Sequence, residues 1–286
     1  MIVSDLQVLP PHNLHDIIRE DRLPHILCPG CGIGIVIGAI ARAIKELNLD
    51  LSKIVIVSGI GCSGRASMYF KTDAFHTTHG RALPLATAIK IARPELKVIV
   101  IAGDGDLFAI GGNHFIHAAR RNINLTVICI NNFNYGMTGG QEGPTTPIKS
   151  LTSTSPYGSM EHPFNLVALA ASAGATYVAR WTVAHVNLLT KSIKRAIQKK
   201  GLSFIDVLSP CPTYYGRYNR IGTTLDIMNM YLKLSRVKSG IPPQDAILDL
   251  HKEIIVGEFV DVEKPEFSEL LHKFVDAQSN KLNLDK

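Results

Sequence analysis

The sequence predicts an α/β fold built on a doubly wound, mostly parallel sheet. Short runs that are almost wholly apolar recur along the chain, as is typical of strands buried on both faces. Segments with helical periodicity separate these runs, so the order is repeatedly strand, helix, strand. The chain has 286 residues, of which 46% are hydrophobic, enough for a substantial core in one large or two small domains.

The expected elements follow one another from residue 32 to residue 208. Helices are expected at residues 32–47, 81–92, 106–121, 163–173 and 183–200. Strands are expected at residues 53–58, 97–102, 125–130, 176–179 and 203–208. The connection over residues 132–162 is long and polar, which indicates a functional loop.

We divide the chain into two parts. Residues 1–215 form the main domain, and residues 216–286 form a less regular extension that packs on this domain or on a partner subunit. The polar end of the extension, residues 278–286, is expected to be disordered.

Charge, hydropathy and cysteine usage exclude several classes of protein. The net charge of +6 is spread along the chain, mostly on solvated helix faces, and forms no compact basic stripe for nucleic acid. A second hypothesis is that the positive charge helps the protein to dock to an acidic electron carrier. No apolar run reaches the roughly 18–20 residues of a membrane span, and no signal peptide is recognised, so we expect a soluble cytoplasmic protein. The odd count of five cysteines argues against a disulfide framework.

A glycine-rich turn at residues 59–64 matches the dinucleotide pattern G-x-G-x-x-G. That fingerprint needs an acidic residue about 20 residues later, at the end of a second strand. Asp73 comes too early with no strand before it, and the strand that ends near Asp104 comes too late. We therefore expect these glycines to bring the backbone close to a bulky cofactor of another kind.

Polar side chains follow two of the expected strands. One strand runs into Asp104, Gly105 and Asp106, and the next runs into Asn132 and Asn134. If the strands are neighbours, these side chains converge at one edge of the sheet, where their oxygens suit Mg²⁺ or Ca²⁺. Gly105 and Asp106 also open a helix, whose free N–H groups favour phosphate. Either fragment alone is readily explained as a turn or a strand-end cap, but together they predict a metal-bridged diphosphate.

Four of the cysteines lie beside glycine or proline. These are Cys28 and Cys31 in a C-x-x-C pair, Cys62 in the glycine-rich turn, and Cys211 between two prolines. Their spacing leaves zinc and an iron–sulfur cluster open, although the wide dispersion favours a redox cluster. A redox-active thiol pair is a lesser alternative. Cys129 lies inside an apolar strand and is expected to be a small buried hydrophobe.

Together these features resemble thiamine-diphosphate enzymes, whose signature is Gly-Asp-Gly followed by Asn-Asn. The resemblance implies that Asp104, Asn132 and the carbonyl of Asn134 bind Mg²⁺. It also implies that Gly136 and Met137 contact the diphosphate.

A narrower resemblance covers roughly residues 20–220. The Cys-Pro-Gly-Cys motif at Cys28, the Gly-Cys-Ser turn at Cys62 and the late cysteine at Cys211 are similar to β subunits of 2-oxoacid:ferredoxin oxidoreductases, where they hold [4Fe–4S]. The stretch His79-Gly80-Arg81 and the segment at residues 135–141 also look like this family's.

The resemblance implies oxidative decarboxylation of a 2-oxoacid with coenzyme A, giving acyl-CoA, CO₂ and reduced ferredoxin. The Gly139-Gly140-Gln141 loop favours 2-oxoglutarate. The backbone turn would line the cofactor through Ile60, Gly61, Cys62 and Ser63. His79 is expected to contact cofactor or substrate, or simply to cap a helix. Arg65 is expected to pair with the substrate carboxylate, or to be a surface arginine.

No glutamate lies where it would activate the thiamine ring, so the resemblance implies that an α subunit, alone or fused to γ, supplies it. Two alternatives remain at this point. One is a non-redox thiamine-diphosphate decarboxylase subunit with structural zinc, and the other is a non-catalytic metal-binding subunit.

Overall fold

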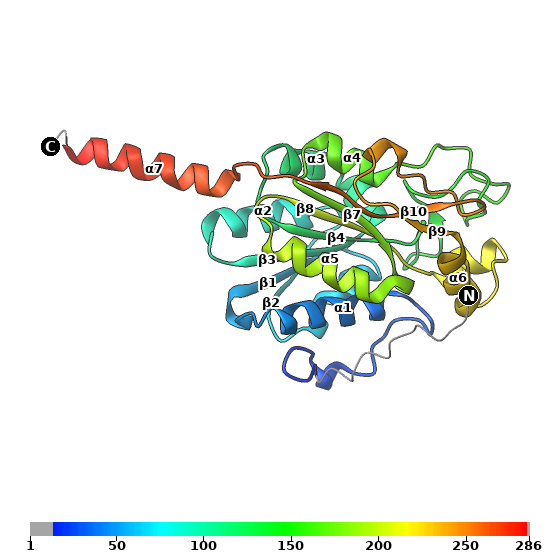
Figure 1. Cartoon of the computed structure of the whole chain (residues 1–286). Helices are drawn as coiled ribbons and strands as arrows, with labels where there is room; N and C mark the ends of the chain where they lie inside the picture. Colours follow the sequence, from blue (N-terminus) through cyan, green and yellow to red (C-terminus); the bar gives the residue numbers. More distant parts are fainter. Residues whose placement is uncertain (1–13, 285–286) are drawn as a thin grey trace.

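The computed structural model describes residues 14–284, with side chains up to residue 280 (Figure 1). Its centre is an eight-stranded sheet with the order β2-β1-β3-β4-β8-β7-β10-β9. All neighbouring strands pair in parallel except β10, which pairs antiparallel with β7. The strands are β1 (Ile54–Ser58), β2 (Asp73–His76), β3 (Lys97–Gly103), β4 (Thr126–Asn131), β7 (Tyr177–Thr182), β8 (Ser203–Leu208), β9 (Ser235–Val237) and β10 (Ile254–Asp261).

Helices cover both faces of this sheet. The apolar cluster on one face includes α1 (Ile33–Glu46) and α5 (Val186–Gln198). The cluster on the other face includes α2 (Ala82–Ala92), α3 (Gly112–Arg120) and α4 (Leu166–Ala173).

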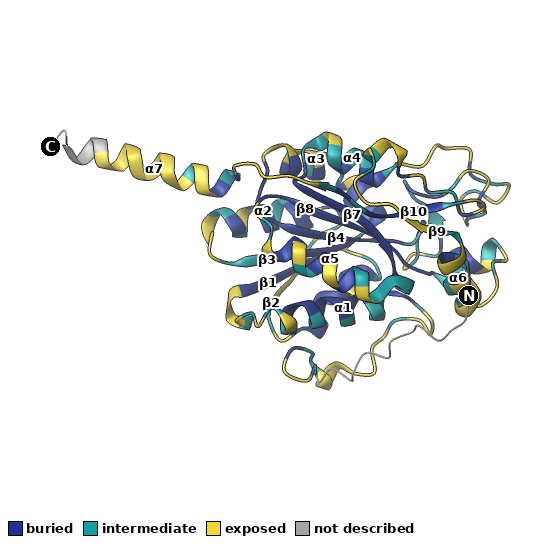
Figure 2. Cartoon of the chain, in the orientation of Figure 1, coloured by how far each residue is buried: buried dark blue, intermediate teal, exposed yellow. Residues whose placement is uncertain are grey.

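The central strands are buried on both sides, as Figure 2 shows. In β3, Ile99 and Ile101 join the cluster with α1, whereas Val98 and Val100 join the cluster with α2. This alternation follows from the two-residue period of a strand and explains why the sequence reads as an apolar run.

The predicted fold class is therefore confirmed, and three details differ. The helix expected at residues 106–121 is a π-helical turn (Asp106–Ile110) followed by α3. A short hairpin of β5 (Asn134–Tyr135) and β6 (Gln141–Glu142) lies in the long polar connection. Strand β2 was not expected, because it is an exposed edge strand without an apolar run.

The C-terminal extension holds more regular structure than its sequence indicates. It contains α6 (Thr224–Leu234), β9, β10 and α7 (Phe267–Leu284). The disorder expected for residues 278–286 is wrong as far as residue 284, because these residues continue α7. Figure 1 shows α7 projecting from the body of the molecule.

Within the described residues, no helix combines the length and the apolar character that crossing a membrane requires.

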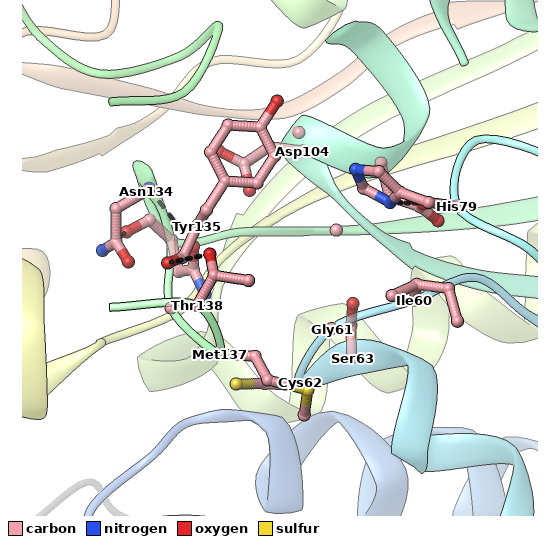
Figure 3. Close-up of a pocket in the computed structure, with 15 residues that line it drawn as sticks. Ile60, Gly61, Cys62, Ser63, His79, Asp104, Asn134, Tyr135, Met137 and Thr138 are labelled. Carbon is pink, nitrogen blue, oxygen red and sulfur yellow. Dashed lines mark hydrogen bonds and ion pairs between the residues drawn. The ribbon is translucent and has the colours of Figure 1, made fainter. Parts of the chain in front are cut away.

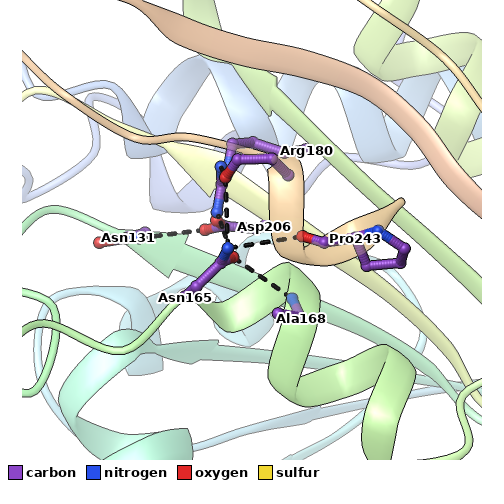
Figure 4. Close-up of polar contacts among 7 residues, drawn as sticks. Asn131, Asn165, Ala168, Arg180, Asp206 and Pro243 are labelled. Atoms are coloured by element: carbon purple, nitrogen blue, oxygen red, sulfur yellow. Dashed lines mark hydrogen bonds and ion pairs between the residues drawn. The ribbon is translucent and has the colours of Figure 1, made fainter. Parts of the chain in front are cut away.

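A buried ion pair joins β7, β8 and the extension (Figure 4). Arg180 Nε lies 2.7 Å from Asp206 Oδ2, and both side chains are fully buried. Arg180 also donates to the carbonyl of Ala246 at 2.9 Å, and Asn131 Nδ2 donates to Asp206 Oδ1 at 3.1 Å. The pair therefore ties the extension to the end of β4, next to the polar residues that follow that strand.

We expect Arg180→Met to lower the free energy of unfolding by about 3–5 kcal/mol, because it leaves Asp206 charged and buried without its partner. Adding Asp206→Leu should restore much of this loss. Arg195→Met is the matched control, since Arg195 pairs with Asp261 at the surface and should cost at most about 1 kcal/mol. Urea unfolding measures all three, and equal losses for Arg180→Met and Arg195→Met would contradict the role of the buried pair.

Candidate active site

The pairing of β3 with β4 brings the expected metal ligands to one edge of the sheet. Gly103 is in register with Ile130, so Asp104 and Asn132 follow neighbouring strands at the same end. Beside them opens a cavity of about 200 Å³ (Figure 3). Its lining includes every residue expected to bind the cofactor or its metal: Ile60, Gly61, Cys62, Ser63, His79, Asp104, Gly105, Asp106, Asn132, Asn134, Gly136 and Met137.

The metal side of this cavity holds one deeply buried carboxylate. Burial raises the pKa of Asp104 to about 6, and a hydrogen bond from the Thr145 hydroxyl to Asp104 Oδ2 partly opposes the rise. Asn132 and Asn134 hold each other, since the Asn134 N–H donates to Asn132 Oδ1 at 3.3 Å and Asn134 Nδ2 donates to the Asn132 carbonyl at 3.0 Å. A divalent cation would offset the cost of burying the Asp104 charge, so these oxygen donors fit Mg²⁺.

The glycine-rich turn forms the opposite wall. A Cβ at Gly59 would lie 1.5 Å from Asp106 Oδ2, so only glycine fits there. Gly61 has a φ of +95°, and a Cβ there would meet nothing within 4 Å, so its backbone borders open space. The turn leads into a 3₁₀ helix (Ser63–Tyr69) and not into an α-helix, unlike a dinucleotide-binding turn.

His79 lies at the side of the cavity next to Asp106. Its Nδ1 is 2.5 Å from Asp106 Oδ1, and the Gly80 N–H donates to the same oxygen at 2.7 Å. The His79 ring also meets the Tyr135 ring edge-on, with 6.1 Å between the centroids.

The four loop cysteines gather around a second, smaller cavity. Cys28, Cys31, Cys62 and Cys211 all line a space of about 80 Å³, together with Arg65. Burial raises the pKa of Cys31 to about 12 and that of Cys62 to about 11, and neighbouring thiols add to both shifts.

The thiols surround this space without meeting at one point. In the described part of the chain, no three His, Cys, Asp or Glu side chains are grouped closely enough to hold a single metal ion. Four thiols spread around a cavity suit a polynuclear cluster, in which each iron takes one thiolate. The fifth cysteine, Cys129, is fully buried in β4, as expected of a core residue.

The two cavities share a wall. Cys62, Asn132, Gly136 and Met137 line both of them. A Cβ at Gly136 would lie 3.6 Å from the sulfur of Cys62 and 3.6 Å from that of Cys211. The cysteine cavity and the cofactor cavity are therefore in direct contact.

Several residues of the site were missed in the sequence. Tyr135 and Thr138 line the larger cavity, and Thr145 contacts Asp104. Tyr135 and Thr138 lie in the segment already noted at residues 135–141, but nothing in the sequence distinguishes Thr145 from its neighbours. Arg65 borders the cysteine cavity and is not among the residues that line the larger one.

This fold and these cavities define a thiamine-diphosphate enzyme. Residues 59–207 match the family model described as "Thiamine pyrophosphate enzyme, C-terminal TPP binding domain". The chain is 55% identical to the 2-oxoglutarate synthase subunit KorB of Methanocaldococcus jannaschii, over 91% of this chain and 96% of that protein. It is 46% identical to KorB of Methanothermobacter marburgensis, over 94% of each.

A solved structure gives the same assignment. The 2-oxoglutarate:ferredoxin oxidoreductase from Magnetococcus marinus, with 2-oxoglutarate, coenzyme A and succinyl-CoA bound, superposes with a TM-score of 0.82 at 32% identity. The similarity covers 96% of this chain and 93% of that chain. This chain belongs to the KorB family of β subunits of 2-oxoacid:ferredoxin oxidoreductases, within the thiamine-diphosphate enzymes.

We expect Gly59→Ala to destabilise the chain by about 1–3 kcal/mol, because the added methyl group collides with the buried Asp106 carboxylate. Gly112→Ala is the matched control. A Cβ there meets nothing within 4 Å, so the change should be neutral or stabilise α3 by up to about 1 kcal/mol. Urea unfolding compares the two, and a neutral Gly59→Ala would show that the turn does not lie against Asp106.

Proposed function

We propose that this chain, with an α partner, catalyses the oxidative decarboxylation of a 2-oxoacid with coenzyme A, with 2-oxoglutarate as the favoured substrate. The products are acyl-CoA and CO₂, and ferredoxin receives the electrons. The names of the KorB relatives and the ligands of the Magnetococcus marinus enzyme support this choice. The observation that carries it is the wall shared by the cofactor cavity and the cysteine cavity.

The larger cavity is the proposed site of thiamine diphosphate. When bound, this cofactor supplies a carbon nucleophile for the 2-oxo group and an electron sink for decarboxylation. Asp104, Asn132 and the carbonyl of Asn134 would hold Mg²⁺ against the diphosphate. Gly136 and Met137 would contact the diphosphate from the loop beyond.

The remaining wall would orient the reacting end of the cofactor. The backbone from Ile60 to Ser63 borders the open space of the cavity, and His79 reaches in from the side. Arg65 is proposed to pair with the substrate carboxylate. Its position at the cysteine cavity places that charge near the wall between the two sites.

The smaller cavity is the proposed site of one [4Fe–4S] cluster, held by Cys28, Cys31, Cys62 and Cys211. When bound, such a cluster accepts electrons one at a time. Cys62 lines both cavities, so a cluster in the smaller cavity would lie next to a cofactor in the larger one.

The α partner is proposed because the site lacks an activating glutamate. No glutamate is among the described residues that line the cavity. Glu142 lies in the nearby hairpin, but its carboxylate accepts hydrogen bonds from Ser155 and Ser159. A glutamate from the α subunit, alone or fused to γ, would complete the site.

Two further features belong to this proposal. We place the protein in the cytoplasm, since none of the five cysteines, all within the described residues, forms a disulfide. We treat residues 1–215 as the unit that holds both cofactors and residues 216–286 as an extension packed on it. A non-redox decarboxylase with structural zinc is not favoured, because the relatives are named as oxidoreductases and synthases.

We expect Asp104→Ala to weaken Mg²⁺–thiamine diphosphate binding by about 100-fold or more, since losing even an outer-shell partner of a metal costs about 10–100-fold. Calorimetric titration of the αβ complex measures this affinity. Asp245→Ala, at an exposed position, is the control and should leave it unchanged. Equal affinities for Asp104→Ala and wild type would remove Asp104 from the metal site.

We expect Cys28→Ser to lose the brown colour and most of the iron and acid-labile sulfide of anaerobically prepared αβ complex, because one thiolate ligand is missing. Cys129→Ala is the control and should keep them, since Cys129 lies in the core away from the cysteine cavity. A colourless wild-type complex with stoichiometric zinc would contradict the redox proposal.

A further inference from the structure

Asp106 was expected to bind the cofactor, but its carboxylate contacts other parts of the chain. Oδ1 receives the Gly80 N–H at 2.7 Å and lies 2.5 Å from His79 Nδ1. Oδ2 is buried against Gly59, where a Cβ would approach it to 1.5 Å. The side chain is only 2% exposed, and Oδ2 has no hydrogen-bond partner among the described residues, so Oδ1 carries the polar contacts of the carboxylate.

The chemistry of a diphosphate also argues against direct contact. An ionised carboxylate offers acceptors and no donor, and the oxygens of a diphosphate are acceptors too. A charged carboxylate and a charged diphosphate would also repel each other in a buried site. Asp106 therefore lines the cavity without offering the diphosphate a favourable contact.

The turn that carries His79 also packs against the π-helical turn that begins at Asp106. A Cβ at Gly80 would lie 2.6 Å from Ile110 Cγ2 and 3.0 Å from the Gly111 nitrogen, so the backbone of Gly80 packs directly on the end of the π-helical turn. On the other side, the ring of Tyr135 meets the His79 ring edge-on. His79 is thus held by its backbone, by Asp106 and by Tyr135.

We propose that Asp106 is a positioning residue that fixes His79 with its proton on Nδ1 and leaves Nε2 free to face the cavity, and that the Asp106 carboxylate is not a ligand of the cofactor. The Asp106 oxygen 2.5 Å from Nδ1 favours a proton on that nitrogen, because an unprotonated Nδ1 would turn its lone pair toward the charged oxygen. His79 Nε2 then accepts a hydrogen bond from the bound substrate or cofactor. In Figure 3 a dashed line marks the ion-pair contact of the His79 ring.

The inference rests on the proposed function, because His79 acts on the substrates named there. Two variants of the αβ complex separate its parts. Asp106→Ala removes Oδ1, the oxygen that faces both His79 Nδ1 and the Gly80 N–H, and so removes the group that selects the tautomer. His79→Asn keeps a donor at the place of Nδ1 but has no group at the place of Nε2.

We expect each variant to lower kcat for 2-oxoglutarate-dependent viologen reduction by about 100-fold or more, in the range of a lost general acid–base group. The affinity for Mg²⁺–thiamine diphosphate should stay within about threefold of wild type. The double variant should be no slower than His79→Asn alone, because both changes disable one unit. Asp245→Ala is again the control and should match wild type.

Three results would overturn the inference. The first is wild-type kcat in Asp106→Ala or His79→Asn. The second is an Asp106→Ala variant that loses cofactor affinity and regains wild-type kcat at saturating cofactor, which would make the Asp106 carboxylate a cofactor ligand. The third is a double variant whose loss is the product of the two single losses.

A second measurement is independent of turnover. In the full chain labelled with ¹⁵N-histidine, the His79 signals are identified by their absence in His79→Asn. We expect a protonated Nδ1 and an unprotonated Nε2 in wild type, and loss of this pattern in Asp106→Ala. A wild-type His79 protonated on Nε2 alone would overturn the inference. A wild-type complex that oxidises no 2-oxoacid would instead refute the proposed function, and the nitrogen signals would still decide the role of Asp106.

Discussion

The parallel pairing of β3 with β4 is the constraint on which the rest of the site depends. Because Gly103 is in register with Ile130, the chain leaves both strands at one edge, and Asp104 and Asn132 follow at adjacent points. A slip of one residue would turn every side chain of the strand to the opposite face, so the two apolar layers hold this register firmly. The same packing that buries the strands therefore places the oxygen donors.

The second feature of the site is the wall that its two cavities share. The glycine-rich turn after β1 borders the larger cavity with its backbone and the smaller one with Cys62. Gly136 lies between the sulfurs of Cys62 and Cys211 and leaves room for both. An oxidation that delivers electrons singly gains from such a wall, because donor and acceptor need not move to meet.

The sequence predicts the strands with least ambiguity where they are buried on both faces. The apolar runs of β3, β4 and β8 leave few other structures open, and Asp104 and Asn132 follow directly from their ends. The exposed edge strand β2 has no such run, and α6 is marked only by its Thr223–Asp226 cap. Both depend on tertiary neighbours, which periodicity does not report.

The candidate site, like the fold, could be predicted from the sequence only in part. The residue types and motifs predict which side chains line each cavity, but contacts between distant segments need the folded chain. The approach of Asp106 to His79 joins two segments that follow different elements, and the hydrogen bond from Thr145 to Asp104 comes from the long polar connection. Arg65 was expected beside the substrate, and only the structure places it at the cysteine cavity.

The proposed function requires electrons to pass from the cofactor cavity to the cysteine cavity through their common wall. Rapid-freeze electron paramagnetic resonance of the anaerobic αβ complex, mixed with 2-oxoglutarate and coenzyme A without ferredoxin, tests it most directly. We expect the signal of a reduced [4Fe–4S] cluster to grow within a single turnover and to be absent in a Cys28→Ser complex. Release of CO₂ with no reduced-cluster signal in the wild-type complex would contradict it.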